Sequence, residues 1–153
     1  MKLLFVCTGN TCRSPMAQAL AQKIFTDKNI IGQIDSAGIF ANPFQGASVN
    51  SILAMKDFGI DISNYKSKQI TKNMLDENDF IIAMTKSHKN FLLADFPDYQ
   101  KKIFTLSEFA CNNNYDIIDP FGQSLEIYKE CANEIYYFVN KISDKFSMGE
   151  DKL

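Results

Sequence analysis

The sequence is poor in the residue types that define several common protein classes. It contains no tryptophan, a single histidine and four cysteines, at positions 7, 12, 111 and 131. No two cysteines are spaced as a CxxC pair, and with one histidine they do not form a zinc-ligand set of usual spacing. Four cysteines in 153 residues also do not fit a secreted scaffold held together by disulfide bonds. We therefore expect a reducing, cytoplasmic environment.

Long hydrophobic runs are also missing. The apolar run Leu3–Val6 is shorter than the core of a signal peptide, and no stretch approaches the roughly 20 apolar residues of a membrane span. The formal net charge of −2 gives no general electrostatic reason to bind nucleic acid or acidic membranes. The chain is long enough for one globular domain. We expect a monomer with neither nucleic acid nor membrane as a partner.

Arginine is almost absent. Of the 16 basic residues, 15 are lysines, and Arg13 is the only arginine. A bias of the genome toward lysine codons explains the scarcity, but it does not explain where the remaining arginine lies. It comes six residues after Cys7, in a loop between a predicted strand and a predicted helix.

The hydrophobic pattern alternates between short strands and longer helices. Residues 3–6 form an apolar run without alternation, as in a strand that is buried on both faces. Further strands are predicted at 33–37, 80–84 and 102–106, and helices at 14–27, 47–58, 86–94 and 124–146. This order predicts a single α/β domain, residues 1–146, with a four-stranded parallel sheet and helices on both faces. Residues 147–153 are predicted to be a flexible tail.

The loop from Cys7 to Ser14 joins the first strand to the first helix, for which Ser14 is the expected N-cap. Ligands of parallel sheets bind beyond the carboxyl ends of the strands, and the free N–H groups and dipole of a helix N-terminus favour anions. Gly9 is expected to allow a positive φ, and Asn10 tolerates the left-handed region, so that successive N–H groups turn inward. We therefore predict a phosphate-binding loop after the first strand.

Three side chains give this loop its chemistry. In such a field Cys7 is expected to be a thiolate nucleophile at neutral pH. Arg13 offers a planar fork that matches two oxygens of a tetrahedral oxyanion, which lysine cannot imitate. Ser14 can donate a hydrogen bond to the sulfur. A C-x5-R spacing also arises by chance around a buried core thiol, but the position between a strand and a helix favours the anion-binding interpretation.

The segment Val6–Ala17, VCTGNTCRSPMA, resembles the signature of the low-molecular-weight protein tyrosine phosphatases. The resemblance spans nearly the whole chain. Asp35–Gly38 resembles the end of the family's second strand, Ile81–Met84 its third strand, and Asp119–Gly122 the loop that bears its general acid. The resemblance implies a cysteine-dependent phosphatase that acts on a phosphorylated protein through a phosphocysteine intermediate, without a metal or other cofactor.

The resemblance also implies a role for each matched residue. Cys7 attacks phosphorus, Arg13 and the loop amides hold the phosphoryl oxygens, and Asp119 protonates the leaving group and then activates water. Asn10, Ser14 and Ser36 resemble the hydrogen-bond network that holds the loop in shape. The phosphate of the substrate, or free inorganic phosphate and similar oxyanions, is expected to contact Thr8, Gly9, Asn10, Thr11, Cys12 and Ser14.

Cys12 and His88 are open to more than one interpretation. Cys12 is either a small apolar filler or a redox partner, and the resemblance implies a protective disulfide between it and Cys7. His88, the single histidine, is interpreted as a surface residue of a short helix with no reason to act beside Cys7.

Three aromatic residues in loops, Phe40, Phe44 and Phe121, are expected to form a wall of the substrate site. Here the sequence departs from the family. Many members have a tryptophan near position 41 and a tyrosine directly after the Asp-Pro pair, where this chain has Ala41 and Phe121.

Phosphotyrosine, together with aryl phosphates, is the first expectation for the substrate, because it is the commonest activity of the family. The alternative is a protein arginine phosphatase, a branch that the chain resembles in Thr8–Thr11, Gly38–Ala41, Ala83–Thr85 and Asp119–Gly122. In tyrosine-specific members the position of Thr11 usually carries an apolar residue that packs on the ring. A hydroxyl at this position suits a narrower, polar guanidinium.

Two further alternatives are disfavoured. An arsenate reductase coupled to thioredoxin shares the fold and the loop, but it needs two more cysteines after the third strand, and the matching positions here are Thr85 and Leu92. A module that only binds oxyanions is also conceivable, but a thiol in the loop would serve it poorly.

Overall fold

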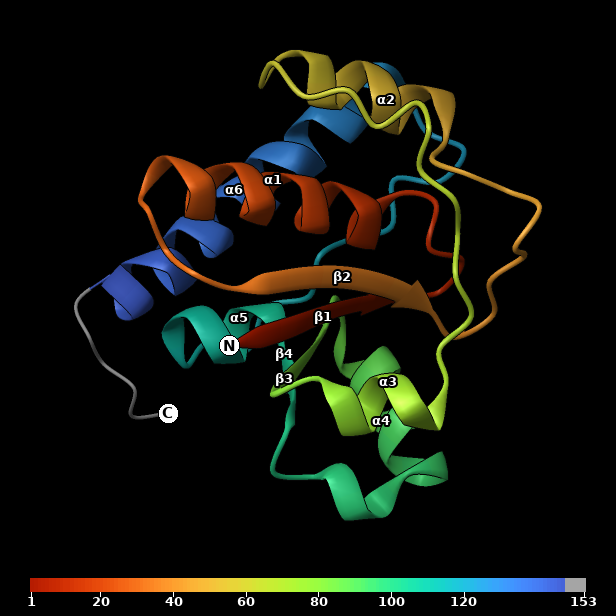
Figure 1. Ribbon diagram of the computed structural model, residues 1–153. Helices are drawn as coiled ribbons and strands as arrows, with labels where there is room; N and C mark the ends of the chain where they lie inside the picture. Colours follow the sequence, from red (N-terminus) through yellow and green to blue (C-terminus); the bar gives the residue numbers. More distant parts are fainter. Residues whose placement is uncertain (148–153) are drawn as a thin grey trace.

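Four parallel strands form the centre of the computed structural model, which describes residues 1–147 (Figure 1). They are β1 (Lys2–Cys7), β2 (Gln33–Gly38), β3 (Phe80–Ala83) and β4 (Ile103–Thr105), in the spatial order β2-β1-β3-β4. The helices are α1 (Arg13–Asp27), α2 (Val49–Lys56), α3 (Lys72–Glu77), α4 (Lys86–Asp95), α5 (Leu106–Cys111) and α6 (Leu125–Ser147), with a 3-10 turn η1 at Pro97–Tyr99. The predicted single α/β domain with a four-stranded parallel sheet is confirmed.

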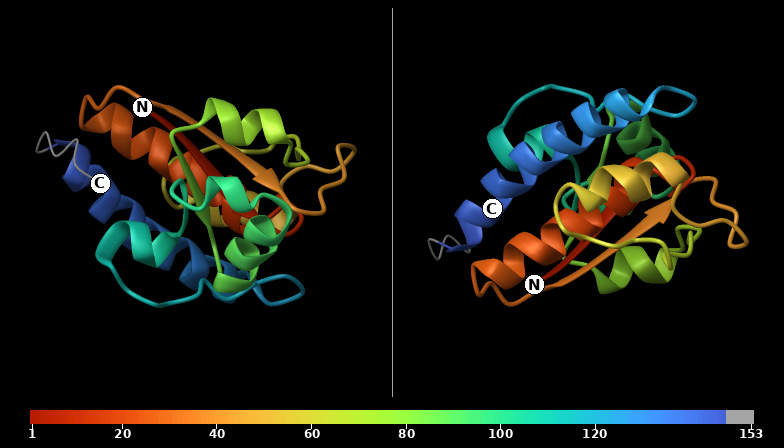
Figure 2. Two further views of the ribbon diagram at one scale, coloured as in Figure 1. Left: turned by 90° about the horizontal axis from the view of Figure 1, so that it is seen from below. Right: turned by 90° about the horizontal axis from the view of Figure 1, so that it is seen from above.

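The central strand β1 is buried on both faces. Leu3 and Phe5 belong to one apolar cluster, and Leu4 and Val6 belong to the other. Helices α1, α5 and α6 cover the first face, with α2 packed against α1 and α6, while α3 and α4 cover the second (Figures 1 and 2). Because a strand alternates its side chains between the two faces, an uninterrupted apolar run needs helices on both.

The long helix α6 carries the apolar stripe that the sequence predicts. Tyr128, Cys131, Ile135, Phe138 and Ile142 are buried at three- to four-residue spacing, and this stripe packs the helix against α1. The helix continues to Ser147, the first residue of the predicted flexible tail. The remainder of that tail, 148–153, lies outside the described residues.

Two short helices were not predicted. Both α3 and α5 have six residues, too few to show a helical period. Each is started by a threonine cap: Thr71 accepts a hydrogen bond from the N–H of Met74, and Thr105 forms a capping box with Glu108.

The carboxyl ends of three strands meet at one edge of the sheet. Cys7 at the end of β1 is paired with Gly38 of β2, and the preceding Val6 is paired with Ala83 of β3. The strand order reverses direction between β1 and β3, because the chain continues from β1 to β2 on one side and from β3 to β4 on the other. Such a switch point is where open α/β sheets bind their ligands.

Candidate active site

The phosphate-binding loop has its left-handed residue at Asn10, with a φ of 56°, whereas Gly9 has no positive φ. The expectation for Gly9 is therefore wrong. Asparagine is among the few residues other than glycine that adopt this region at small cost. The bend at Asn10 is held by the hydrogen bonds of its own side chain, so the loop does not need glycine there.

Gly38 is the glycine that the loop requires. A Cβ at this position would lie 2.7 Å from the carbonyl oxygen of Thr8 and 3.0 Å from the backbone nitrogen of Asn10. The end of β2 thus presses directly on the backbone of the loop. The carbonyls of Cys7 and Thr8 accept hydrogen bonds from the N–H groups of the residues after Gly38, at 3.0 and 2.9 Å.

The side chain of Asn10 is fully buried and all of its hydrogen-bonding atoms are used. Its Oδ1 accepts from the backbone N–H of Lys68 at 2.9 Å and from the hydroxyl of Tyr65 at 2.6 Å. A backbone N–H can only donate, so this contact fixes which way the amide group faces. Its Nδ2 therefore donates to Ser14 Oγ at 2.8 Å and to Ser36 Oγ at 3.0 Å.

This chain of donors ends at the sulfur of Cys7. Ser14 Oγ lies 2.9 Å from Cys7 Sγ and accepts a hydrogen bond from Asn10. Its own hydroxyl can donate to the sulfur, since the other acceptor within reach, the carbonyl of Ala37, lies farther away at 3.5 Å. The prediction that Ser14 is the N-cap of α1 is wrong, because Cys12 occupies that position. The side chain of Cys12 makes no cap hydrogen bond. The first amides of the helix are left without a side-chain cap, which suits an anion.

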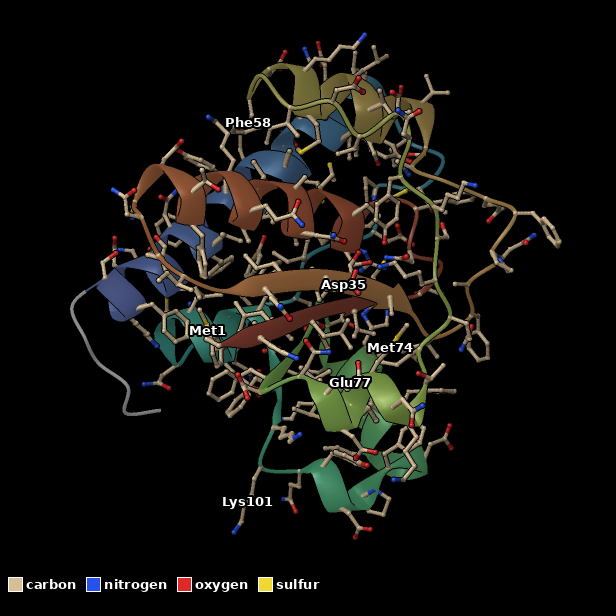
Figure 3. The ribbon with its side chains drawn as sticks, viewed as in Figure 1. Met1, Asp35, Phe58, Met74, Glu77 and Lys101 are labelled. Atoms are coloured by element: carbon tan, nitrogen blue, oxygen red, sulfur yellow. The ribbon has the colours of Figure 1, made fainter. Side chains whose placement is uncertain are left out.

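The segment 65–68 supports the loop from behind. The Tyr65 hydroxyl contacts Ser36 as well as Asn10, and burial raises the pKa of Tyr65 to about 12. Ser67 Oγ donates to the backbone carbonyl of Asn10 at 2.7 Å. The ammonium of Lys68 forms an ion pair with Asp35, which lies on the edge strand β2 and is labelled in Figure 3. These supporting residues gave no signal in the sequence, because they lie more than 50 positions from Asn10 and meet it only in the fold.

Arg13 links the loop to the segment that carries Asp119. Its guanidinium is buried, with Nη1 donating to the carbonyl of Ile117 at 2.8 Å and Nη2 lying 3.5 Å from Asp119 Oδ2. The Asp119 side chain remains half-exposed. The two charged residues singled out by the sequence, 106 positions apart (119 − 13), are thus brought together at one site.

A pocket of about 310 Å³ opens at this point, and most of its predicted lining is present. It is lined by Cys7, Thr8, Gly9, Thr11, Cys12, Arg13, Asp119 and Phe121, and also by Gln45, which the sequence did not single out. The side chains of Asn10 and Ser14, which were expected to contact the phosphate, are fully buried, as is Ser36, and none of the three residues lines the pocket.

The predicted aromatic wall is only partly present. Phe121 lines the pocket, but Phe40 and Phe44 do not. Phe40 packs edge-to-face on Phe91 of α4 at 5.2 Å between ring centroids, and Phe44 is almost fully exposed. The N–H of Phe40 is bonded to the loop at Thr8, which places this backbone near the site while its ring covers the neighbouring helix.

Cys12 is buried beside the pocket. Its sulfur lies 3.3 Å from the hydroxyl of Tyr128 on α6 and 3.5 Å from Ser48 Oγ. Burial, followed by the hydrogen bond with Cys12, raises the pKa of Tyr128 to about 12. Cys7 and Cys12 are both free thiols in this structure, and a protective disulfide between them stays a prediction.

The interpretation of His88 as a surface residue is wrong. The side chain is buried, and its Nε2 lies 2.8 Å from the hydroxyl of Thr8 in the phosphate-binding loop. Helix α4 begins directly after β3 at the carboxyl edge of the sheet, so its first turn lies next to the loop that follows β1. Burial, reinforced by the positive charge of Arg13, lowers the pKa of His88 to about 4.

Two absences hold for the part of the chain that the structure describes. Within residues 1–147 there is no group of three or more His, Cys, Asp or Glu side chains that could hold a metal ion. No helix in the same range is long and apolar enough to cross a membrane.

Comparison with known proteins places the chain in a family. Residues 2–149 match the family described as low molecular weight phosphotyrosine protein phosphatase, and the chain belongs to this family. It is 36% identical over 143 residues to a protein-arginine-phosphatase of Bacillus subtilis (strain 168), across 94% of this chain and 95% of that protein. It is 34% identical over 142 residues to the low molecular weight protein-tyrosine-phosphatase PtpB of Staphylococcus haemolyticus (strain JCSC1435), across 93% and 97%.

A solved structure agrees with this placement. The YwlE arginine phosphatase, as a cysteine-to-serine mutant with a phosphorylated active-site serine, superimposes with a TM-score of 0.94 at 34% identity, covering 99% of this chain and 98% of the other. The protein is therefore a phosphatase of the low-molecular-weight family.

Proposed function

We propose that this phosphatase acts on phosphoarginine in proteins. The observation that carries the proposal is the polar lining of the pocket, where Thr11, Gln45 and Asp119 are found with a single aromatic residue, Phe121. A guanidinium group is a planar cation with several N–H donors. The carboxyl of Asp119, the amide oxygen of Gln45 and the hydroxyl of Thr11 each offer an oxygen that can accept from such a group, and the carboxyl of Asp119 does so in either protonation state.

The relatives support the same choice. A protein-arginine-phosphatase of Bacillus subtilis is similar over nearly the full length of both chains, and so is the YwlE arginine phosphatase in its solved structure. Phosphotyrosine, the first expectation from the sequence, becomes the second candidate. Phe121 and the similarity to PtpB favour it, but the ring of phosphotyrosine would find neither Phe40 nor Phe44 in the pocket.

In the first step of the proposed mechanism, the Cys7 thiolate attacks phosphorus. An S–P bond forms while the bond between phosphorus and the guanidinium nitrogen breaks, and protonated Asp119 transfers its proton to that nitrogen. The guanidinium of Arg13 and the free amides at the start of α1 stabilise the negative charge on the phosphoryl oxygens. For phosphotyrosine the same step would break a P–O bond.

In the second step the intermediate is hydrolysed. The Asp119 carboxylate takes a proton from water, the water oxygen attacks phosphorus, and the S–P bond breaks to release inorganic phosphate. The returning thiolate is stabilised by the hydroxyl of Ser14, which lies 2.9 Å from the sulfur. The phosphorylated active-site serine of the YwlE mutant supports a nucleophilic role for Cys7, because serine there retains the phosphoryl group.

The test compares two peptides of the same sequence, one with phosphoarginine and the other with phosphotyrosine. We expect kcat/KM to favour phosphoarginine by at least about tenfold, since each acceptor left unpaired in the pocket costs roughly 1 kcal/mol or more. Thr11→Ile should lower this preference several-fold, whereas Thr11→Ser, which keeps the hydroxyl, should retain it. A preference for phosphotyrosine in the wild type would overturn the proposal in favour of the second candidate.

A further inference from the structure

His88 is a buried polar residue that the mechanism above does not use. Its Nε2 contacts Thr8 Oγ1 at 2.8 Å, and Thr8 lines the pocket. The other ring nitrogen, Nδ1, is buried without a hydrogen-bond partner among the described residues. A buried polar atom of this kind has a cost in stability, so its retention suggests a role for the ring.

The position of the ring is fixed from its own helix. The N–H of His88 donates to the side chain of Thr85, the N-cap of α4, at 3.2 Å. The N–H of Lys86, in the same turn, donates to Asp116 Oδ1 at 2.9 Å. The first turn of α4 is thus tied to its own N-cap and to the segment before Asp119, and the side chain of its third residue, His88, contacts the phosphate-binding loop.

The imidazole is neutral at pH 7, because its pKa is lowered to about 4 by burial and by Arg13, against the smaller opposing effects of Asp119 and Asp116. A neutral imidazole carries one N–H. With the proton on Nδ1, a buried donor would have no acceptor. With the proton on Nε2, the N–H donates to Thr8 Oγ1, and only a lone pair is left unpaired. Orphaned buried N–H groups are the rarer case, so we assign the proton to Nε2.

The assigned proton position determines what the hydroxyl of Thr8 can do. A hydroxyl that accepts a hydrogen bond from His88 does not need to donate back to it, and its own proton is free to turn toward the pocket. We propose that His88 is a positioning residue, which orients the Thr8 hydroxyl as an additional hydrogen-bond donor to the phosphoryl group of the substrate. The proposal rests on the phosphatase activity of the family and holds for either candidate substrate.

A double-mutant cycle tests the proposal. Thr8→Val removes the hydroxyl and should lower kcat/KM for an aryl phosphate roughly tenfold, the usual effect of one hydrogen bond to a charged group. His88→Asn, whose amide reaches only the place of Nδ1, should lower kcat/KM by a similar factor. His88→Gln, whose amide nitrogen reaches the place of Nε2, should stay within about twofold of the wild type. Both variants replace the ring with an amide, so the comparison separates the loss of the hydrogen bond to Thr8 from the loss of the imidazole ring.

The decisive measurement is the double variant Thr8→Val with His88→Asn. If His88 acts through the Thr8 hydroxyl, the double variant should be no slower than Thr8→Val alone. The proposal would be overturned if His88→Asn lowered kcat/KM by the same factor in the Thr8→Val variant as in the wild type. It would also be overturned if His88→Gln folded but had the low kcat/KM of His88→Asn. Failure of the phosphoarginine proposal would appear elsewhere, in the ratio of kcat/KM between the two peptides.

Discussion

The two loops that form the candidate active site are built in opposite ways. The phosphate-binding loop, residues 7–14, is largely buried, and its left-handed residue Asn10 forms hydrogen bonds with β2, α1 and the segment 65–68. In the segment 116–123 only Ile117 and Pro120 are buried. The N–H of Ile117 donates to the carbonyl of Met84, and its own carbonyl accepts from Arg13. The side chain of Asp119 is half-exposed and Phe121 is mostly exposed.

The difference follows from what each loop has to do. Stabilising a phosphoryl transition state requires donors that are already in place, because reorganising them during the reaction would cost part of the stabilisation. In the proposed mechanism, the segment 116–123 supplies an acid for two successive steps and an aromatic contact for the substrate, and both need access to solvent and substrate. We therefore expect changes in the buried loop to affect all substrates, and changes in the exposed segment to depend on the substrate.

The largest expected effect is at Cys7. Cys7→Ser should lower turnover of an aryl phosphate by at least about 10³-fold, because a neutral hydroxyl is a far weaker nucleophile than a thiolate. Cys12→Ser, a matched change in the same loop, should keep substantial activity. Steady-state kinetics of the two purified variants provide the measurement. Equal activity of the wild type and Cys7→Ser would refute the proposed mechanism.

The next effect concerns Asp119 in the exposed segment. Asp119→Asn should lower kcat about 10²-fold for phosphate esters with poor leaving groups and much less for those with good ones, since only poor leaving groups need a proton. A series of aryl phosphates with increasing leaving-group pKa measures this dependence. A uniform loss across the series would remove Asp119 as the acid.

Substitution of two glycines, one beside the buried loop and one within the exposed loop, tests the contrast between the two loops. Gly38→Ala should lower kcat/KM more than tenfold for every substrate and destabilise the fold by about 2 kcal/mol, because the added Cβ would lie 2.7 Å from the Thr8 carbonyl. Gly122, in the exposed segment, has a φ of 75° and open space around it. Gly122→Ala should cost about 1 kcal/mol of local strain and change activity little. Denaturant unfolding and kinetics on both variants would show whether the contrast holds.

The smallest effect is expected at the aromatic wall. Phe121→Ala should lower kcat/KM for phosphopeptides several-fold, because it removes apolar contact from the pocket. Phe40→Ala removes a ring of the same size that packs on Phe91 outside the pocket, and should change kcat/KM less than about twofold. A larger loss for Phe40→Ala would mean that bound peptides extend over α4.

The sequence predicted best what is encoded locally. The apolar run of β1, the loop with its thiol and arginine, and the stripe of α6 each lie within one short segment, and the fold places them as expected. The prediction of a positive φ at Gly9 was an exception. The left-handed residue is Asn10, which is held by hydrogen bonds from residues distant in the sequence, such as Lys68. The direction in which the Phe40 ring would turn could also not be read from a loop sequence.

By itself, the sequence determined the loop from Cys7 to Ser14 and its place after a buried strand, because strand, turn and helix signals depend on neighbouring residues. Only the tertiary structure decided what surrounds that loop: the support from Tyr65 and Ser67, the polar wall at Gln45, and the contact of His88 with Thr8. These contacts join segments tens of residues apart, and their distances are set by how the helices pack on the two faces of the sheet. The loop from Cys7 to Ser14 is therefore encoded locally, but its shape is held by side chains whose contacts with it form only when the chain has folded.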